Sequence, residues 1–168
     1  MTKHILFPIA ITALIIAFLG LIVKKYQPTT PTPTTKNRVE EQKPKVKINN
    51  TEIEVEIADT PEKRTKGLSG RDSLDQNKGM LFVFPKESTA TFWMKDMKFD
   101  LDIIWIRDSK IVKIDKKAKA PKAGTPDNKL TLYHSEKPID YVLEVNSGFA
   151  DKNNIKVGDK VELINFQE

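Results

Sequence analysis

Trp93 and Lys95 are the residues whose types and spacing best suit contact with a ligand. Side chains two residues apart on a β-strand point to the same side, so an indole ring and an ammonium group would lie together. An aromatic plane beside a cation suits a sugar ring or a small acidic molecule. The alternative is that Trp93 closes the edge of the hydrophobic core while the Lys95 stem runs along it to water.

Arg71 and Asp102 complete the candidate site. Arg71 follows a glycine-rich turn, and Asp102 lies within an apolar run. A buried carboxylate needs a partner, so we predict that Asp102 pairs with Arg71 or with Lys95. We favour a structural role for this pair over catalysis, because ion pairs that only hold a fold also perturb titration. The enzymatic alternative uses Asp102 or Asp96 as acid and base, with Lys95 as electrostatic stabiliser.

Common catalytic and metal-binding patterns are missing from the sequence. The chain has no cysteine, which excludes thiol nucleophiles, disulfides and cysteine-bound zinc. Ser69 lies in Gly-Leu-Ser-Gly (67–70), one residue short of the hydrolase nucleophile motif. We interpret His134 as a polar residue at a strand end and not as a general base. Asp100 and Asp102 would need further oxygen ligands to hold a divalent cation, so we predict no metal and no cofactor.

The positive charge of the chain is confined to its N-terminal part. Residues 1–45 contain 7 basic and 2 acidic residues, whereas residues 46–168 contain 21 of each. The net charge of +5 therefore does not describe a basic face on the folded part. We predict no nucleic-acid partner, and the sequence leaves the oligomeric state open.

Residues 5–23 form a stretch of 19 residues without a charge, followed by Lys24 and Lys25. As a helix this stretch would span roughly 28 Å, close to the hydrocarbon thickness of a bilayer. We predict a retained membrane anchor over residues 1–26. The alternative is a cleaved signal peptide, which usually has a shorter apolar core and small residues at its cleavage site.

Residues 27–45 are rich in proline and threonine and contain too few apolar residues to form a core, which predicts a flexible linker. The folded domain is predicted over residues 46–168. Its first clear strand is 51–58, where three apolar residues alternate with glutamates. Thr60 and Pro61 then predict a capped helix that runs to about Lys66 and stops at Gly67.

Short apolar runs rich in β-branched and aromatic residues make up the rest of the domain. They predict a mainly β fold: a small barrel or sandwich of about seven or eight strands with one short packed helix, behind the transmembrane helix. Tight turns are expected at 108–110 and at 158–159. The predicted runs are 80–84, 91–97, 101–106, 111–114, 130–133, 141–145 and 160–166.

Several sequence blocks, in this order, resemble the domain-of-unknown-function family 192 (DUF192, also called UPF0127). The resemblance covers nearly all of residues 51–164 and implies a compact, mainly β protein, often exported behind a signal peptide or an anchor, for which no activity is implied. Ser69 stands where methionine is usual in that family, and Asp96 where asparagine is usual. The blocks are Arg64-x2-Gly67-Leu68-Ser69-Gly70-Arg71, Gly79-Met80-Leu81-Phe82-Val83-Phe84, Phe92-Trp93-Met94-Lys95-Asp96-Met97, Leu101-Asp102-Ile103 and Tyr141-Val142-Leu143-Glu144-Val145.

These observations favour a membrane-anchored, extracytoplasmic binding module over an enzyme. The expected ligand is a sugar or a small acid, bound in a cleft near Arg71, Trp93, Lys95 and Asp102. Two alternatives stay open at this stage. One is an envelope enzyme that uses the acid–base chemistry described above, and the other is a structural partner of another envelope protein.

Overall fold

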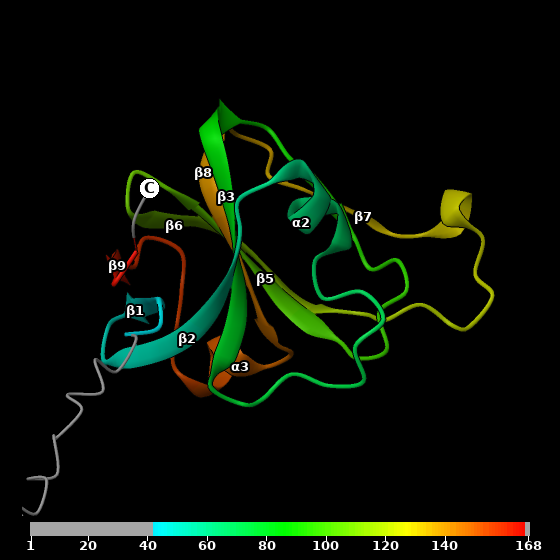
Figure 1. Ribbon diagram of the computed structural model, residues 1–168, viewed down its shortest axis with the longest axis horizontal. Helices are drawn as coiled ribbons and strands as arrows, with labels where there is room; N and C mark the ends of the chain where they lie inside the picture. The colour runs from blue at the N-terminus through cyan, green and yellow to red at the C-terminus, as the bar shows by residue number, and fades with distance from the viewer. Residues whose placement is uncertain (1–41, 167–168) are drawn as a thin grey trace, which may run out of the picture. The chain divides into compact units, whose positions relative to one another are not determined.

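Strands dominate residues 42–166, which are the residues that the computed structural model describes (Figure 1). This part of the chain forms nine strands, two short α-helices and one 3-10 helix. In chain order they are β1 (Lys45–Ile48), β2 (Thr51–Ala58), α2 (Pro61–Lys66), β3 (Lys78–Ser88), β4 (Thr91–Trp93), β5 (Leu101–Arg107), β6 (Lys110–Ala118), η1 (Asp127–Lys129), β7 (Leu132–His134), β8 (Ile139–Asn146), α3 (Phe149–Lys152) and β9 (Val161–Ile164).

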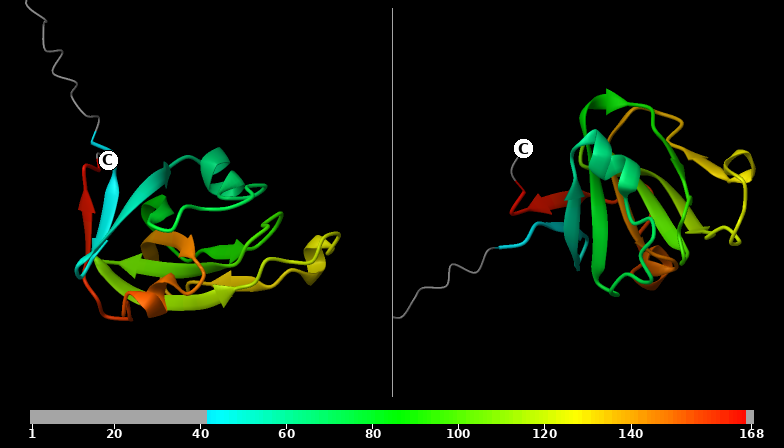
Figure 2. Two further views of the ribbon diagram at one scale, coloured as in Figure 1. Left: turned by 90° about the horizontal axis from the view of Figure 1, so that it is seen from below. Right: turned by 45° about the vertical axis from the view of Figure 1, so that its right-hand side comes forward.

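Seven strands form one curled sheet in the order β6-β5-β8-β3-β2-β1-β9, and β4 pairs with β7 in a separate two-stranded ribbon (Figures 1 and 2). Only β2 and β3 run parallel, because α2 lies in the connection between them. The two edge strands approach each other at one end, where Ile111 N donates to Asp159 O at 3.0 Å and Val161 N donates to Ser109 O at 2.9 Å. The result is a curled half-barrel.

The predicted mainly β class is confirmed, with nine strands instead of seven or eight and with short helices in addition to the predicted one. β1 was not predicted, because its four residues include two lysines and directly follow the proline-rich segment. The predicted transmembrane helix lies outside the described residues. Among residues 42–166, no helix is long and apolar enough to cross a membrane.

Local sequence signals account for the elements around α2. In β2, Ile53 and Val55 point into the core while the glutamates remain partly or fully exposed, as the alternation predicted. The Thr60 hydroxyl accepts a hydrogen bond from Lys63 N at 3.2 Å and caps the helix. Gly67 ends the helix with a positive φ of 47°, which a residue with a side chain adopts only with strain.

Two hydrophobic clusters pack on opposite faces of the sheet. One contains Leu143 and Val145 of β8 together with residues of β1, β9 and α3. The other contains Val142 of β8 and is covered by Leu68, which follows α2, and by partly buried residues of the β4–β7 ribbon. Strands β5 and β8 are therefore buried on both faces, and their residues alternate between the two clusters.

The predicted strand 91–97 is wrong after Trp93. The chain turns at this point: Met97 N donates to Met94 O at 3.1 Å, and Asp96 has a φ of 56°. Aspartate and asparagine tolerate this left-handed conformation better than most residues do. The turn buries both Met94 and Met97, which the predicted alternation had placed on opposite faces.

The predicted turn after β5 is confirmed. Asp108 and Ser109 both have positive φ, 47° and 56°, as in the two-residue turns that suit the twist of a β-hairpin.

Candidate functional site

A cavity of about 470 Å³ lies between α2 and the outer face of the sheet. We call it the α2 cavity. Its walls include four aromatic side chains from β3 and β4, its charged lining residues come from α2 and β8, and it falls within the size range of small-molecule sites. A second hollow of about 590 Å³ adjoins it and shares Lys66 and Trp93 with it. The aromatic residues are Phe82, Phe84, Phe92 and Trp93.

The aromatic wall is held rigidly on its inner side. The Phe92 ring packs edge to face against Phe82 with a centroid distance of 4.8 Å and against Trp105 at 5.4 Å. Such contacts fix ring orientation and add to the stabilisation from burial. Trp93, on the outer side, is 45% exposed. A ligand therefore meets a preformed apolar surface with one accessible indole ring at its edge.

Arg64 and Lys66 place positive charge on the α2 side of the cavity. Arg64 Nη1 donates to Asp59 O at 2.7 Å and to Val83 O at 2.9 Å, and its guanidinium lies 5.5 Å from the centroid of the Phe84 ring. Within residues 42–166, neither cation is within ion-pair distance of an acidic side chain. Both charges are thus available to an anionic group of a ligand.

Glu144 is the buried polar group of this cavity. It lies on β8 opposite Met80 of β3 and Ile103 of β5, and therefore on the face that α2 covers. The residue is 5% exposed, and within the described residues its carboxyl group forms no hydrogen bond and no ion pair. Its oxygens are not completely enclosed, because the fully buried side-chain polar atom without a hydrogen-bond partner in residues 42–166 is Arg107 Nε. Burial raises the pKa of Glu144 to about 8, so the carboxyl is mostly protonated at neutral pH.

The backbone of β8 at Glu144 is positioned by the close approach of β3. A Cβ atom added at Gly79 would lie 2.7 Å from the carbonyl oxygen of Glu144. Real structures do not tolerate such a contact, so any side chain at Gly79 would push the two strands apart. Sequence reasoning did not identify Glu144. The available signal was an acidic residue inside a strand that is otherwise apolar.

Trp93 and Lys95 do come together, but through the turn after β4 and not as two residues on one face of a strand. The Lys95 ammonium lies 5.4 Å from the centroid of the Trp93 ring and 2.5 Å from Asp127 Oδ2. The hydrogen bond to Asp127 raises the pKa of Lys95, so this charge is already engaged. Lys95 lines the adjoining hollow and not the α2 cavity. Trp93 does not close the core, since nearly half of it is exposed.

Arg71 and Asp102 lie elsewhere, and the predicted pairing of Asp102 with Arg71 or Lys95 is wrong. Arg71 forms a two-pronged ion pair with Glu56 of β2, with distances of 2.5 and 2.8 Å. This bond lowers the pKa of Glu56. Arg71 and Asp102 do not line the α2 cavity or the adjoining hollow.

Asp102 is fully buried on the face of the sheet opposite Glu144. Its carboxylate accepts three backbone hydrogen bonds: from Lys117 N at 2.8 Å, from Gly148 N at 3.1 Å and from Ala150 N at 2.9 Å. These bonds join β5 to the end of β6 and to the start of α3. Asp102 therefore holds the fold together and has no access to a substrate.

The serine and histidine considered above are not paired with each other. The Ser69 hydroxyl donates to the Lys95 carbonyl oxygen at 2.9 Å, and His134 Nδ1 lies 3.0 Å from Thr91 Oγ1. His134 is the last residue of β7, which agrees with its interpretation as a strand-end residue.

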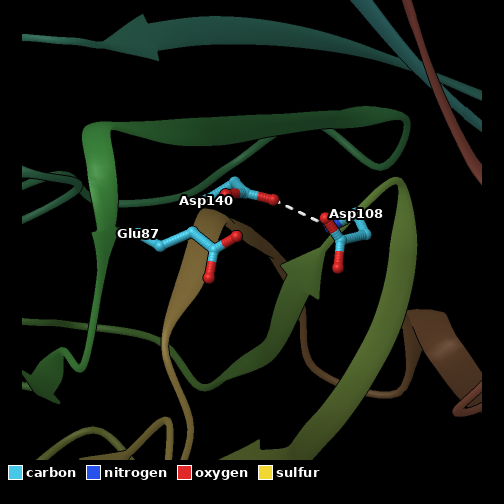
Figure 3. Close-up of side chains that lie close together, drawn as sticks. All are labelled: Glu87, Asp108 and Asp140. Carbon is cyan, nitrogen blue, oxygen red and sulfur yellow. Dashed lines mark hydrogen bonds between the residues drawn. The ribbon is translucent and has the colours of Figure 1, made fainter.

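Glu87, Asp108 and Asp140 bring three carboxylates close together at the hairpin that joins β5 and β6 (Figure 3). Arg107 neutralises part of this charge: its Nη2 lies 2.9 Å from Glu87 Oε2 and its Nε lies 3.4 Å from Asp108 Oδ2. Asp140 accepts a hydrogen bond from Asp108 N at 2.8 Å. These internal contacts account for the close approach of the three carboxylates.

The fold and the cavity together define a small half-barrel domain with a ligand-sized cavity beside its crossover helix. The model of the DUF192 family (Uncharacterized ACR) matches residues 44–163, and the chain belongs to this family. The comparison with curated proteins gave no match.

Two solved structures have similar folds. One, from Sinorhizobium meliloti 1021, is provisionally described as a transcription regulator; it is 27% identical, with a TM-score of 0.64 over 73% of this chain and 95% of its own. The other, a protein of unknown function from Novosphingobium aromaticivorans DSM 12444, is 32% identical, with a TM-score of 0.63 over 70% of this chain and 83% of its own.

Proposed function

We propose that the protein is a binding module that takes a small ligand with an anionic group and a flat apolar part into the α2 cavity. One observation carries this proposal: a cavity of suitable size combines fixed aromatic walls with two cations that no acidic side chain of residues 42–166 neutralises. Aromatic rings supply most of the contact area in such sites, and a few charged groups determine orientation.

Under this proposal, Trp93 and Lys66 are the lining residues that a ligand reaches most easily. Trp93 lines both the α2 cavity and the adjoining hollow, and its exposed ring suits stacking against a flat molecule. Lys66 lines both hollows as well and is exposed. We propose the small acidic ligand of the sequence analysis again, with Arg64 and Lys66 in place of Arg71 and Asp102 as the residues that bind it.

The expected result is saturable binding of 3-phenylpropanoate, an anion with an aromatic ring, in isothermal titration calorimetry with the full-length chain in lipid nanodiscs. Trp93→Ala should weaken the affinity on the order of tenfold through the lost ring contact. Lys66→Ala should weaken it by up to about fivefold, because one exposed ion pair contributes up to about 1 kcal/mol.

Lys63→Ala is the matched control for Lys66→Ala. Lys63 also lies on α2, but it pairs with Asp59 at 2.8 Å and does not line the cavity. Its substitution should leave the affinity unchanged. The proposal fails if no saturable binding occurs, if Lys63→Ala and Lys66→Ala weaken binding equally, or if Trp93→Ala lowers only the melting temperature.

We further propose that residues 5–23 hold this module at a membrane and that residues 27–45 let it extend on the extracytoplasmic side. The uncharged length of residues 5–23 supports the membrane anchor. The resemblance to exported proteins supports the extracytoplasmic side, against the basic residues at 24, 25, 36 and 38, which by the positive-inside rule favour the cytoplasm. The full-length chain should remain with the membrane fraction after carbonate extraction, and deletion of residues 1–26 should release it. Recovery of the full-length chain in the soluble fraction would contradict the anchor.

A further inference from the structure

Glu144 has a property that the fold itself does not explain. A carboxyl group that is largely buried, with no hydrogen-bond partner from the protein, destabilises the folded state, so native structures rarely keep one without another use for it. Asp102 shows the structural use of a buried acid, since three backbone N–H groups of neighbouring elements bind it. Glu144 binds no such group within residues 42–166, and instead it lines the α2 cavity.

The groups that face Glu144 from the surrounding elements are mostly apolar. Met80 of β3 and Ile103 of β5 are its direct neighbours in the sheet, and both are buried. The charged residues that line the same cavity are Arg64 and Lys66, both on α2. Burial raises the pKa of Glu144, and within the described residues neither Arg64 nor Lys66 forms an ion pair with its carboxyl group. The cavity therefore has a basic side and a separate acidic side.

We propose that the ligand of the α2 cavity is a small zwitterion, whose cationic amine binds Glu144 while its anionic group binds Arg64 and Lys66. This inference rests on the proposed function and adds the class of ligand. Glu144 is the only acidic residue among those that line the α2 cavity.

The aromatic walls favour an amine over a neutral group at the Glu144 side of the cavity. Phe82 and Phe92 belong to the same lining, and aromatic rings attract cations to their faces. Anionic oxygens of the ligand already have partners of opposite charge on α2. An ammonium group would supply the hydrogen bonds and the charge that the Glu144 carboxyl lacks, since an ionised pair is stable in a buried site only when both members are present.

Binding of an amine in this way is coupled to the loss of a proton. In the free protein, Glu144 keeps its proton at neutral pH, and the incoming ammonium group favours the ionised carboxylate. The affinity should therefore rise with pH until Glu144 is already ionised in the free protein. With a pKa of about 8, this gives nearly a tenfold gain between pH 6 and pH 7 and a smaller gain between pH 7 and pH 8.

Three matched probes test the inference by calorimetry on the full-length chain in nanodiscs at pH 6, 7 and 8. L-phenylalanine carries an amine, a carboxylate and a ring. 3-Phenylpropanoate lacks the amine, and 2-phenylethylamine lacks the carboxylate. L-phenylalanine should bind at least tenfold more tightly than either of the other two at pH 8, and its affinity should follow the pH dependence given above.

Glu144→Gln keeps the shape of the side chain and removes its charge. This variant should bind L-phenylalanine at least tenfold more weakly at pH 8, with no remaining pH dependence, and should bind 3-phenylpropanoate as well as the unmodified chain does. Glu162→Gln is the control, because Glu162 is exposed on β9 and does not line the cavity. It should change neither affinity.

The outcomes separate this inference from the proposed function. Binding of 3-phenylpropanoate as tight as that of L-phenylalanine, with an affinity that falls as the pH rises, would show that protonated Glu144 donates to a ligand oxygen. That result overturns the zwitterion and leaves the anion-binding site intact. If none of the three probes binds at millimolar concentration, both proposals fail.

Discussion

The folded domain should lose stability as the pH rises from 5 to 8, and Glu144→Gln should remove most of this loss. The folded state keeps Glu144 protonated up to a pKa of about 8, whereas the unfolded chain releases the same proton near its ordinary value of 4.5. Between these two values the folded state binds more protons than the unfolded state, so the free energy of unfolding falls with rising pH. The stabilising contribution is complete below about pH 4.5 and is lost by about pH 8.

The expected size of this effect is about 3–5 kcal/mol, because each pKa unit corresponds to about 1.4 kcal/mol. This is a large part of the stability of an ordinary domain, which is about 5–15 kcal/mol. Exposed carboxylates whose pKa values are lowered by lysine partners, such as Glu52 and Asp59, act in the opposite direction. Their stabilising contribution is lost only as the pH falls through their lowered pKa values. The change in the free energy of unfolding between pH 5 and pH 8 is therefore assigned to Glu144.

Urea unfolding at pH 5, 6, 7 and 8 measures the effect directly. Glu144→Gln should give a nearly constant free energy of unfolding across this range and should be more stable than the unmodified chain at pH 8. Glu162→Gln should retain the slope, since Glu162 is exposed. A slope that persists in Glu144→Gln would show that another group causes it, and a flat profile for the unmodified chain would mean that Glu144 is ionised or hydrogen-bonded in the folded state.

Asp102→Asn should lower the free energy of unfolding by about 2–4 kcal/mol and leave ligand affinity unchanged in the folded fraction. Oδ1 of Asp102 accepts from Lys117 N and Gly148 N, and Oδ2 accepts from Ala150 N. An asparagine retains one acceptor oxygen and directs an NH2 group at the remaining N–H donor. Because the site is fully buried, water cannot replace the lost bond.

Asp100→Asn is the matched control for this variant. Asp100 also accepts a backbone hydrogen bond, from Ala120 N at 2.9 Å, and pairs with Lys119, but its side chain is 30% exposed. Its substitution should lower stability by less than about 1 kcal/mol. Equal losses for the two variants would contradict the structural role of Asp102. Unchanged stability with lost binding in Asp102→Asn would restore Asp102 as a ligand-binding residue, as the sequence first indicated.

Features that depend on neighbours along the chain were predictable from the sequence. The alternation in 51–58 identified β2, and Thr60, Pro61 and Gly67 identified both ends of α2. Trp93 and Lys95 also lie together, although a turn and not the predicted strand spacing brings them into contact. In each case the relevant contacts lie within a few residues, where backbone geometry leaves few alternatives.

The positions of the buried acids required the tertiary structure. Strands β5 and β8 are apolar on both faces, so the sequence does not show which residues lie under α2 and which lie under α3. The packing of the helices on the sheet places Glu144 at the α2 cavity and Asp102 on the opposite face. Ion-pair partners were equally undetermined: Arg71 binds Glu56 of β2, which becomes its neighbour only when the sheet forms.

The sequence by itself thus determined a mainly β domain and its capped helix, because short-range sterics and alternation specify these features. Only the tertiary structure decided which charged groups meet a cavity. A carboxyl group is bound, paired or left without a partner according to the segments packed against it, and those segments come from distant parts of the chain.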